Sequence, residues 1–396
     1  MKKEVYLDCA STTYLNPEVL KAMKPFQQKS FGNPGSLHRL GVEAKKAVSE
    51  ARKKIAGILD CSSSEIIFTG SGTESDNLAI LGVAKNFKTK ELSYKPHIIT
   101  SAIEHKAVLE PCKELEKEGF DVVYLETDEF GMVSPDEIAK TIKPETFLVS
   151  IMYANNEVGT IQPIKEIAKV IRRANKERTV SNKILFHTDA CQASGALPLN
   201  VQKLGVDLMT INGSKIYGPK GVGVLYKKTG VAVKPLIFGG GQERGLRSGT
   251  ENVAGIVGMA KALEIAEKRR EKESLKLSAL RDYFIEKVLK IIPDARLNGH
   301  PKDRLPNNAN ISFKNVDGEA LVLFLDKEGI YVSTGSACTS DADYSYVIKE
   351  LRVPKEYANG TARFTLCRDT TKKDIDYVLK NLSPIVEKLR KYSTKI

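Results

Sequence analysis

The feature that most constrains the fold of this chain is a repeated alternation of short apolar runs and helical patterns. Each run is followed by a polar loop and then by a stretch with helical periodicity, which is typical of β-α units with parallel strands. The runs are residues 66–69, 97–101, 147–152, 184–188 and 208–211. The sequence therefore predicts an α/β fold with a large, mostly parallel sheet.

The C-terminal part of the chain has a different pattern. A long helix rich in Ala, Leu, Glu and Lys is expected over about residues 255–290, followed by α+β structure. The expected strands are 310–313 and 330–332, and the expected helices are 319–327 and 372–392. A length of 396 residues suits about two domains. We expect a large domain of residues 15–258 and a smaller domain made of residues 1–14 and 259–396.

The composition indicates a soluble globular protein, with 41% hydrophobic and 28% charged residues. No apolar stretch reaches the roughly 18 residues of a membrane span, and the first residues do not form a signal peptide, so we expect a cytoplasmic protein with no membrane partner. The six cysteines are scattered, which predicts reduced thiols and no metal site. The net charge of +12 permits binding to nucleic acid, but interleaved charges such as those of residues 267–273 are typical of a solvated helix face. No direct nucleic-acid binding is expected.

Lys215 follows the run 208–211 and lies in a loop rich in Gly and Pro. A lysine at the end of a buried strand loses solvation, which lowers its pKa and allows it to form a Schiff base with a carbonyl cofactor. Pyridoxal phosphate (PLP) is bound in this way. The alternative is an ordinary solvated lysine. The residues predicted to lie near Lys215 distinguish the two interpretations.

PLP also needs donors for its phosphate, an anion for its pyridine nitrogen and a stacking partner for its ring. Gly72 and Thr73 precede a helical pattern and can supply a backbone N–H and a hydroxyl at the helix N-terminus. Asp189 is a candidate for the pyridinium, or else a helix cap. Gln192 is a candidate for the phenolic oxygen of the ring. His105 is a candidate for stacking and proton transfer, or else a structural histidine.

The residues that can do chemistry follow predicted strands. They are Thr73, His105, Asn155, Asp189, Gln192 and Lys215. Parallel sheets bind ligands outside the carboxyl ends of their strands, so these residues are predicted to face one crevice.

Two further candidates lie near the C-terminus. Cys338 stands among small residues that leave its sulfur accessible, as a nucleophilic thiol requires, although such a cysteine can also have no catalytic role. Cys367 lies in an apolar run and is expected to be structural. Arg363 can bind an amino-acid carboxylate with its forked guanidinium, or be a surface residue.

Several stretches together carry a family resemblance. They are Gly32-Asn33-Pro34, Thr73-Glu74-Ser75-Asp76-Asn77, Glu104-His105-Lys106, Asn155-Asn156-Glu157, His187-Thr188-Asp189-Ala190-Cys191-Gln192, the glycine-rich stretch 239–250 and Ser336-Ala337-Cys338-Thr339-Ser340. From about residue 6 to residue 382 the chain resembles cysteine desulfurases of the NifS/IscS type, which are fold-type-I PLP enzymes. The resemblance implies that Lys215 is the Schiff-base lysine, Asp189 the pyridinium partner, His105 the stacking acid-base group and Cys338 the sulfur acceptor.

The same resemblance implies an activity and an assembly. L-cysteine would become L-alanine, and Cys338 would keep the sulfur as a persulfide for iron-sulfur cluster assembly or another thiolation pathway, with an iron-sulfur scaffold as the expected acceptor. Asn155 and Arg363 would hold the substrate carboxylate. Thr250 would reach the phosphate in the neighbouring subunit, which requires a homodimer. A selenocysteine lyase, a weakly active paralogue and a basic binding protein without turnover stay open as alternatives.

The chain departs from the family pattern at four positions. Family members usually have a Ser and a His that bind phosphate where this chain has Asn212 and Ser214, which can still donate hydrogen bonds. We expect this change to affect cofactor affinity more than chemistry. Cys9 and Cys367 also replace other residues, for no reason that is evident from the sequence.

Overall fold

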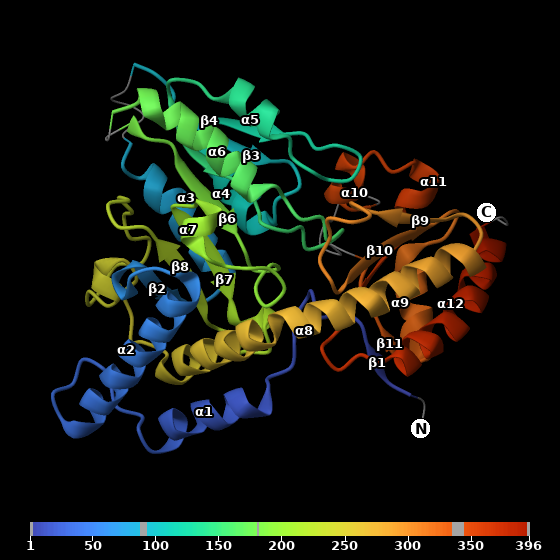
Figure 1. The fold of residues 1–396 in the computed structure, drawn as a ribbon, viewed down its shortest axis with the longest axis horizontal. Helices are drawn as coiled ribbons and strands as arrows, with labels where there is room; N and C mark the ends of the chain where they lie inside the picture. Colours follow the sequence, from blue (N-terminus) through green and yellow to red (C-terminus); the bar gives the residue numbers. More distant parts are fainter. Residues whose placement is uncertain (1–2, 88–92, 180–181, 335–343, 394–396) are drawn as a thin grey trace.

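A seven-stranded sheet lies at the centre of the larger part of the molecule (Figure 1). The structure is a computed structural model that describes residues 3–87, 93–179, 182–334 and 344–393. The strand order is β2-β8-β7-β6-β5-β3-β4. The strands are β2 Ile66–Thr69, β3 His97–Ser101, β4 Asp121–Leu125, β5 Thr146–Ser150, β6 Leu185–Asp189, β7 Leu208–Asn212 and β8 Gly223–Lys227. Neighbours from β4 to β7 pair in parallel, which confirms the predicted mostly parallel sheet.

Strand β8 is the one strand of this sheet that runs antiparallel to the others, so β2 still has the same direction as β7. Because β8 runs antiparallel to both β7 and β2, these two strands point the same way. The carboxyl ends of β2, β3, β6 and β7 therefore meet at one edge of the sheet, as ligand binding at such an edge requires.

Helices cover both faces of this sheet (Figure 1). The helices of this part of the molecule are α1 Pro17–Gln28, α2 Arg39–Leu59, α3 Gly72–Ala84, α4 Lys106–Lys117, α5 Pro135–Thr141, α6 Ile164–Ala174, α7 Val201–Leu204 and α8 Val253–Ile291, with 3₁₀ turns η1 Ser63–Glu65, η3 Asn175–Glu177, η5 Gly213–Lys215 and η6 Glu243–Gly245. Val149 packs into a core with α2, α6 and the first half of α8, whereas Leu148 packs into a core with α3 and α4. This is the alternation expected of a strand buried on both faces.

A separate core lies in the smaller part of the molecule. Its strands are β9 Ala295–Asn298, β10 Asn308–Phe313 and β12 Thr361–Thr365 in one antiparallel sheet, and β1 Val5–Tyr6 paired in parallel with β11 Ile330–Tyr331. Its helices are α9 Gly318–Lys327, α10 Tyr346–Glu350, α11 Lys355–Ala358 and α12 Lys372–Ser393. Helix α8 contributes Ala266 to the first core and Leu277 to this one. The domain division at residue 258 stays a prediction, because α8 continues through that position. None of the helices in the described ranges has the length and apolarity needed to cross a membrane.

Residues 8–13, which we call the crossing segment, pass from the small sheet to the large one. Leu7 accepts a hydrogen bond from the backbone N–H of Thr365 in β12 at 2.7 Å. At the other end, the N–H of Thr13 donates to the carbonyl oxygen of Ser214 at 2.9 Å. The segment therefore lies between β12 and the loop that carries Lys215.

One expectation about the cysteines is wrong. Cys9 in the crossing segment and Cys367 after β12 form a disulfide, with their Cα atoms 5.7 Å apart, so these two thiols are not free. They are 358 residues apart in the sequence, and only the folded chain brings them together. Cys61, Cys112 and Cys191 are free, as expected, and Cys338 lies outside the described residues.

Candidate active site

A cavity of about 510 Å³ opens at the edge of the large sheet where the parallel strands end. Its volume is within the usual range for small-molecule sites. The sequence-predicted residues that line it are Gly72, Thr73, His105, Asp189, Gln192, Asn212, Lys215 and Arg363. Arg363 comes from β12, whereas the other residues end or follow strands of the large sheet. The predicted crevice is therefore present, and the small sheet closes one side of it.

Lys215 ends the 3₁₀ turn η5, directly after β7. Its Nζ donates to the carbonyl oxygens of Ala10 at 2.8 Å and Ser11 at 2.6 Å. Burial lowers the pKa of Lys215, as the sequence predicted. A larger fraction of the amine is therefore neutral near pH 7 than for a solvated lysine, and a neutral amine can attack a carbonyl group.

Asp189 ends β6, and its Oδ1 accepts the backbone N–H of Cys191 at 2.8 Å. Gly72, in the first turn of α3, packs closely against this region. A Cβ atom at Gly72 would lie 2.9 Å from Cys191 Sγ and 3.3 Å from Asn212 Cβ. A glycine is thus needed for the N-terminus of α3 to approach the ends of β6 and β7 this closely.

A buried polar network lies behind Asp189. His187 shares hydrogen bonds with Ser150 Oγ at 2.8 Å and Thr210 Oγ1 at 3.2 Å, and its Nε2 is 3.6 Å from Asp76 Oδ1. Burial lowers the pKa of His187 to about 4. Burial, together with the nearby Asp189, raises the pKa of Asp76 well above its usual range. Burial thus disfavours the charged form of both His187 and Asp76 beside Asp189.

His105 forms the N-cap of α4 at the rim of the cavity. Its Nδ1 accepts the backbone N–H of Ala107 at 3.1 Å, which leaves the ring proton on Nε2 when the imidazole is neutral. Although the residue is exposed at the rim, loss of solvation lowers the pKa of His105. The first turn of α4 thus fixes a neutral imidazole at the cavity opening.

Arg363 is held by the crossing segment and by the loop after β5. Its Nη2 donates to Asp8 Oδ1 at 2.9 Å and Ser11 Oγ at 2.6 Å, and its Nη1 donates to the carbonyl oxygen of Asn156 at 3.0 Å. Its Nε is buried and has no hydrogen-bond partner among the described residues. One edge of the guanidinium is therefore partly free for a substrate carboxylate, while Asp8 competes for the other nitrogen.

Three of the predicted residues in the described ranges do not line this cavity. Asn155 is fully buried, and its side chain bonds the backbone of Ile103, Glu157 and Val158 instead. Ser214 Oγ donates to Asn212 Oδ1 at 3.2 Å and does not reach the cavity wall. Thr250 is exposed in the loop after η6. Cys338 lies outside the residues that the structure describes.

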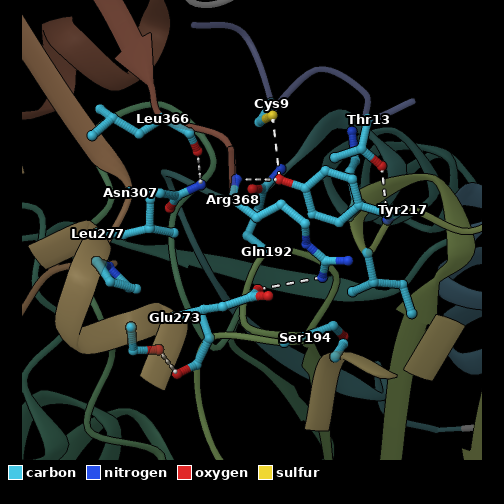
Figure 2. A pocket seen from close by; sticks show the side chains of 17 residues that line it. Cys9, Thr13, Gln192, Ser194, Tyr217, Glu273, Leu277, Asn307, Leu366 and Arg368 are labelled. Carbon is cyan, nitrogen blue, oxygen red and sulfur yellow. Dashed lines mark hydrogen bonds and ion pairs between the residues drawn. The ribbon is translucent and has the colours of Figure 1, made fainter. Parts of the chain in front are cut away.

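A smaller cavity of about 60 Å³ is also lined by Lys215. Its other walls come from the loops after β6 and β7, from α8 and from the chain just after β12 (Figure 2). Arg368 extends across it, with the guanidinium carbon 3.9 Å from the centre of the Tyr217 ring and Nη2 3.3 Å from Glu273. Gln192 and Lys215 line both cavities. The small cavity therefore adjoins the active site at the crossing segment, where Cys9 forms part of its wall.

The sequence did not point to the crossing segment as part of the site. Ala10 and Ser11 bind Lys215 through backbone carbonyl groups, which leave no signal in residue type. Tyr346, whose hydroxyl donates to the carbonyl oxygen of Glu104 at 2.6 Å, also lines the cavity. A signal was visible for Asp76, Lys106, Asn156, Glu157 and Cys191, because they lie in stretches that carry the family resemblance.

The chain matches the aminotransferase class-V family over residues 5–378. The cysteine desulfurase IscS of Dictyoglomus turgidum is 52% identical over 394 residues, which cover 99% of this chain and 97% of that protein. The cysteine desulfurase IscS of Methanosarcina thermophila is 48% identical, with 99% and 94% covered. The chain therefore belongs to the aminotransferase class-V family and, within it, to the cysteine desulfurases, which are PLP-dependent enzymes.

Solved structures confirm the predicted fold-type-I architecture. A NifS-like protein has a TM-score of 0.90 at 40% identity and covers 98% of this chain and 100% of its own. A structure of SspA in complex with cysteine has a TM-score of 0.79 at 35% identity, with 92% and 99% covered.

The residues of the large cavity fit PLP, the predicted cofactor. The amine of Lys215 has the lowered pKa that covalent binding needs. The N-terminus of α3, with Gly72 and Thr73 in the cavity wall, offers N–H groups and a positive dipole end to a phosphate. Asp189 is available to a pyridine nitrogen from the end of β6.

Proposed function

We propose that this protein converts L-cysteine to L-alanine and transfers the sulfur to Cys338 as a persulfide. The observation that carries the proposal is that Lys215, Asp189, His105 and Arg363 line one cavity although they come from distant parts of the chain. An amine of lowered pKa, a carboxylate, an imidazole and a guanidinium are the groups needed to bind PLP and an amino acid side by side.

Binding of the substrate is assigned to Arg363. Its unpartnered Nε can donate to the carboxylate of cysteine, and the hydrogen bond from Nη1 to the carbonyl oxygen of Asn156 keeps the guanidinium in the cavity wall. Asn155 is proposed to act indirectly, because its side chain fixes the turn that carries Asn156.

Proton transfer is assigned to Lys215 and His105. Bound PLP would withdraw electrons from the substrate Cα and so make its proton acidic. Lys215, with its lowered pKa, can accept that proton and return it, and neutral His105 can exchange a proton at Nε2. The carbonyl oxygens of Ala10 and Ser11 hold the Lys215 amine whenever it carries the extra proton.

Sulfur transfer is assigned to the Cys338 thiolate. It attacks the substrate sulfur, and the Cβ–S bond breaks as the new S–S bond forms. The electron pair of the broken bond goes to Cβ, which takes up a proton, and alanine leaves. We propose an iron-sulfur scaffold or another thiolation protein in the cytoplasm as the acceptor of this sulfur, in keeping with the IscS names of the relatives.

We also propose a homodimer in which Thr250 completes the partner's phosphate site. Thr250 is exposed and does not line the cavity of its own chain. Large apolar side chains are unusually exposed near α1, α2 and the glycine-rich loop, among them Phe31, Leu37 and Phe238 at 68%, 97% and 77%. Contact with a second copy would cover such side chains.

Alanine formation from cysteine by the PLP-loaded protein tests the proposed activity. Lys215→Ala should form no alanine and should bind PLP only loosely. The exposed Lys220 is the matched control, and Lys220→Ala should keep near wild-type turnover. If the effects of the two substitutions were reversed, the assignment of Lys215 would be wrong.

The dimer has its own test. A mixture of Lys215→Ala and Thr250→Ala chains can form a mixed dimer, in which one site combines an intact Lys215 with an intact Thr250. Mixing should therefore restore activity beyond that of Thr250→Ala alone. No recovery in dimers shown to be mixed would place Thr250 outside the partner's site.

A further inference from the structure

The crossing segment, residues 8–13, binds three side chains of the active site. The carbonyl oxygens of Ala10 and Ser11 accept hydrogen bonds from Lys215, and the carbonyl oxygen of Ala10 also accepts one from Gln192 Nε2 at 2.9 Å. Asp8 and Ser11 accept hydrogen bonds from Arg363. The position of this short segment therefore determines what Lys215, Gln192 and Arg363 contact.

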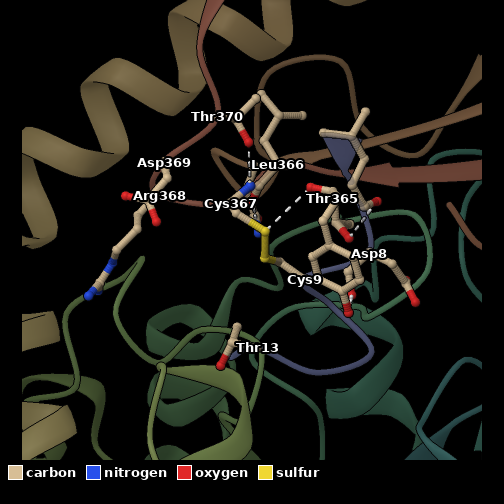
Figure 3. Close-up of a disulfide and its surroundings, with 12 residues drawn as sticks. Asp8, Cys9, Thr13, Thr365, Leu366, Cys367, Arg368, Asp369 and Thr370 are labelled. Atoms are coloured by element: carbon tan, nitrogen blue, oxygen red, sulfur yellow. Dashed lines mark hydrogen bonds between the residues drawn. A yellow bond between two sulfur atoms is a disulfide. The ribbon is translucent and has the colours of Figure 1, made fainter. Parts of the chain in front are cut away.

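A disulfide attaches the start of this segment to the small sheet. Cys9 is bonded to Cys367, which lies two residues after the end of β12 (Figure 3). The neighbouring backbone supports the same arrangement, since the N–H of Ala10 donates to Thr365 Oγ1 at 3.0 Å. The disulfide thus holds the segment at the point from which its carbonyl groups reach Lys215.

The surroundings of the two sulfur atoms also suit the reduced state. Cys9 Sγ lies 3.7 Å from the hydroxyl of Tyr217, and Cys367 Sγ lies 3.6 Å from the carbonyl oxygen of Tyr6. Each thiol would therefore have a hydrogen-bond partner at hand after reduction. The two cysteines pack with Tyr217 in a small apolar cluster, and Cys9 also borders the small cavity that Lys215 lines. The hydroxyl of Tyr217 accepts the backbone N–H of Arg368 at 2.7 Å, so it has a hydrogen-bond partner in either redox state.

We propose that Cys9 and Cys367 are a reversible redox modification site that controls how firmly the crossing segment is held against Lys215. In the oxidising direction, the two thiols give up two protons and two electrons to a low-molecular-weight disulfide, which is reduced to two thiols. A dithiol or an excess of a small thiol reverses the exchange. Disulfides in reducing compartments are commonly of this switching kind.

Burial sets the rate of this exchange. Cys9 and Cys367 are only 5% and 6% exposed, so an attacking thiolate reaches them after local opening of the segment. Exchange should therefore be slow in the folded protein. After reduction the segment is held only by hydrogen bonds, and the carbonyl groups that contact Lys215 move more freely.

The first experiment maps the thiols across glutathione buffers. The protein is equilibrated at a series of ratios of reduced to oxidised glutathione, denatured, alkylated and digested. Peptides that contain Cys9 and Cys367 should change reversibly from alkylated to cross-linked as the buffer becomes more oxidising, while Cys61 and Cys112 stay alkylated. A cross-link present at every ratio, or at none, would overturn the proposal.

The second experiment measures the effect on the segment and on Lys215. Oxidised protein, reduced protein and the Cys9→Ser/Cys367→Ser variant are compared by hydrogen exchange, with Cys61→Ser as the matched control. Amides of residues 8–13 should exchange roughly tenfold faster or more in the reduced protein and the variant, and those of β6 should not change. The apo forms of the reduced protein and of the double variant should capture PLP about threefold to tenfold faster than the oxidised apoprotein, as expected for one weakened hydrogen bond.

The comparison of oxidised and reduced wild type needs no substitution, so it stands even if the double variant folds poorly. Equal exchange of residues 8–13 in the two redox states would show that the disulfide does not hold the segment, and would overturn the proposed control. If the oxidised, reduced and variant proteins all lacked desulfurase activity, the proposed function would be contradicted. The hydrogen-exchange comparison would still test the redox proposal.

Discussion

Lys215 Nζ lies 2.8 Å from the carbonyl oxygen of Ala10, although 205 residues separate the two in the sequence. The lysine therefore rests on the backbone of the N-terminal segment rather than on a side chain. An acceptor of this kind can hold the amine when it is charged, and it does not depend on the identity of residue 10. The crossing segment is thus part of the active site, and its Ser11 contacts both Lys215 and Arg363.

Substitution of Ser214 by histidine should tighten PLP binding. An imidazole at this position can donate to the phosphate, which is worth at most about 1.5–3 kcal/mol for a hydrogen bond to a charged group. Titration of the apoprotein with PLP measures the change. Ser214→Ala is the control, and it should leave the affinity unchanged because the hydroxyl of Ser214 bonds Asn212 rather than facing the cavity. If Ser214→His were no tighter than wild type, position 214 would not reach the phosphate.

Cys338→Ser should keep the yellow colour of bound PLP and still bind cysteine, because Lys215 and Asp189 lie elsewhere in the chain. It should not form a persulfide, since a hydroxyl is too weakly acidic to replace a thiolate. Mass spectrometry of wild type after incubation with cysteine should place one additional sulfur on the peptide of Cys338, and Cys61→Ser should behave like wild type. Additional sulfur on Cys191 instead would identify a different carrier.

Asp8→Asn should lower the KM for cysteine. Asp8 competes with the substrate carboxylate for Arg363, and an amide oxygen competes less strongly than a carboxylate. The difference of about 1 kcal/mol between charged and neutral hydrogen bonds corresponds to a decrease of roughly threefold to tenfold. Arg363→Lys should raise the KM by about tenfold or more. A higher KM in Asp8→Asn would mean that Asp8 orients Arg363 for the substrate rather than competing with it.

Glu104→Gln should make stability less dependent on pH. Burial raises the pKa of Glu104 from 4.5 to about 8, while Ser101 and Met152 donate to its Oε1. The folded state binds the carboxyl proton of Glu104 more tightly than the unfolded state does. The stabilisation from this proton is therefore complete below pH 4.5 and is lost as the pH rises through 8. The loss is up to about 5 kcal/mol. Denaturant unfolding measures this at pH 5 and pH 8. The free energy of unfolding of Glu104→Gln, relative to that of wild type, should be higher at pH 8 than at pH 5. The exposed Glu319→Gln should show no such change.

The local pattern of apolar and polar residues was sufficient to predict much of the fold. The sequence predicted β2 and β3 with the bounds that the structure has, and it placed Lys215 correctly just after β7. Strand and helix patterns are set by neighbours within a few residues, and the rule that parallel strands bind ligands at their carboxyl ends then brought Thr73, Asp189 and Lys215 to one cavity.

Other features depended on packing between distant segments. The buried position of Asn155, the salt bridge of Arg363 with Asp8, and the Cys9–Cys367 disulfide are long-range features with no periodicity to reveal them. Residue type alone determined which groups could bind PLP and cysteine. Only the tertiary structure decided which of these groups face the cavity and which backbone atoms hold them, because strand order and the path of the N-terminal segment arise from the packing of two separate cores.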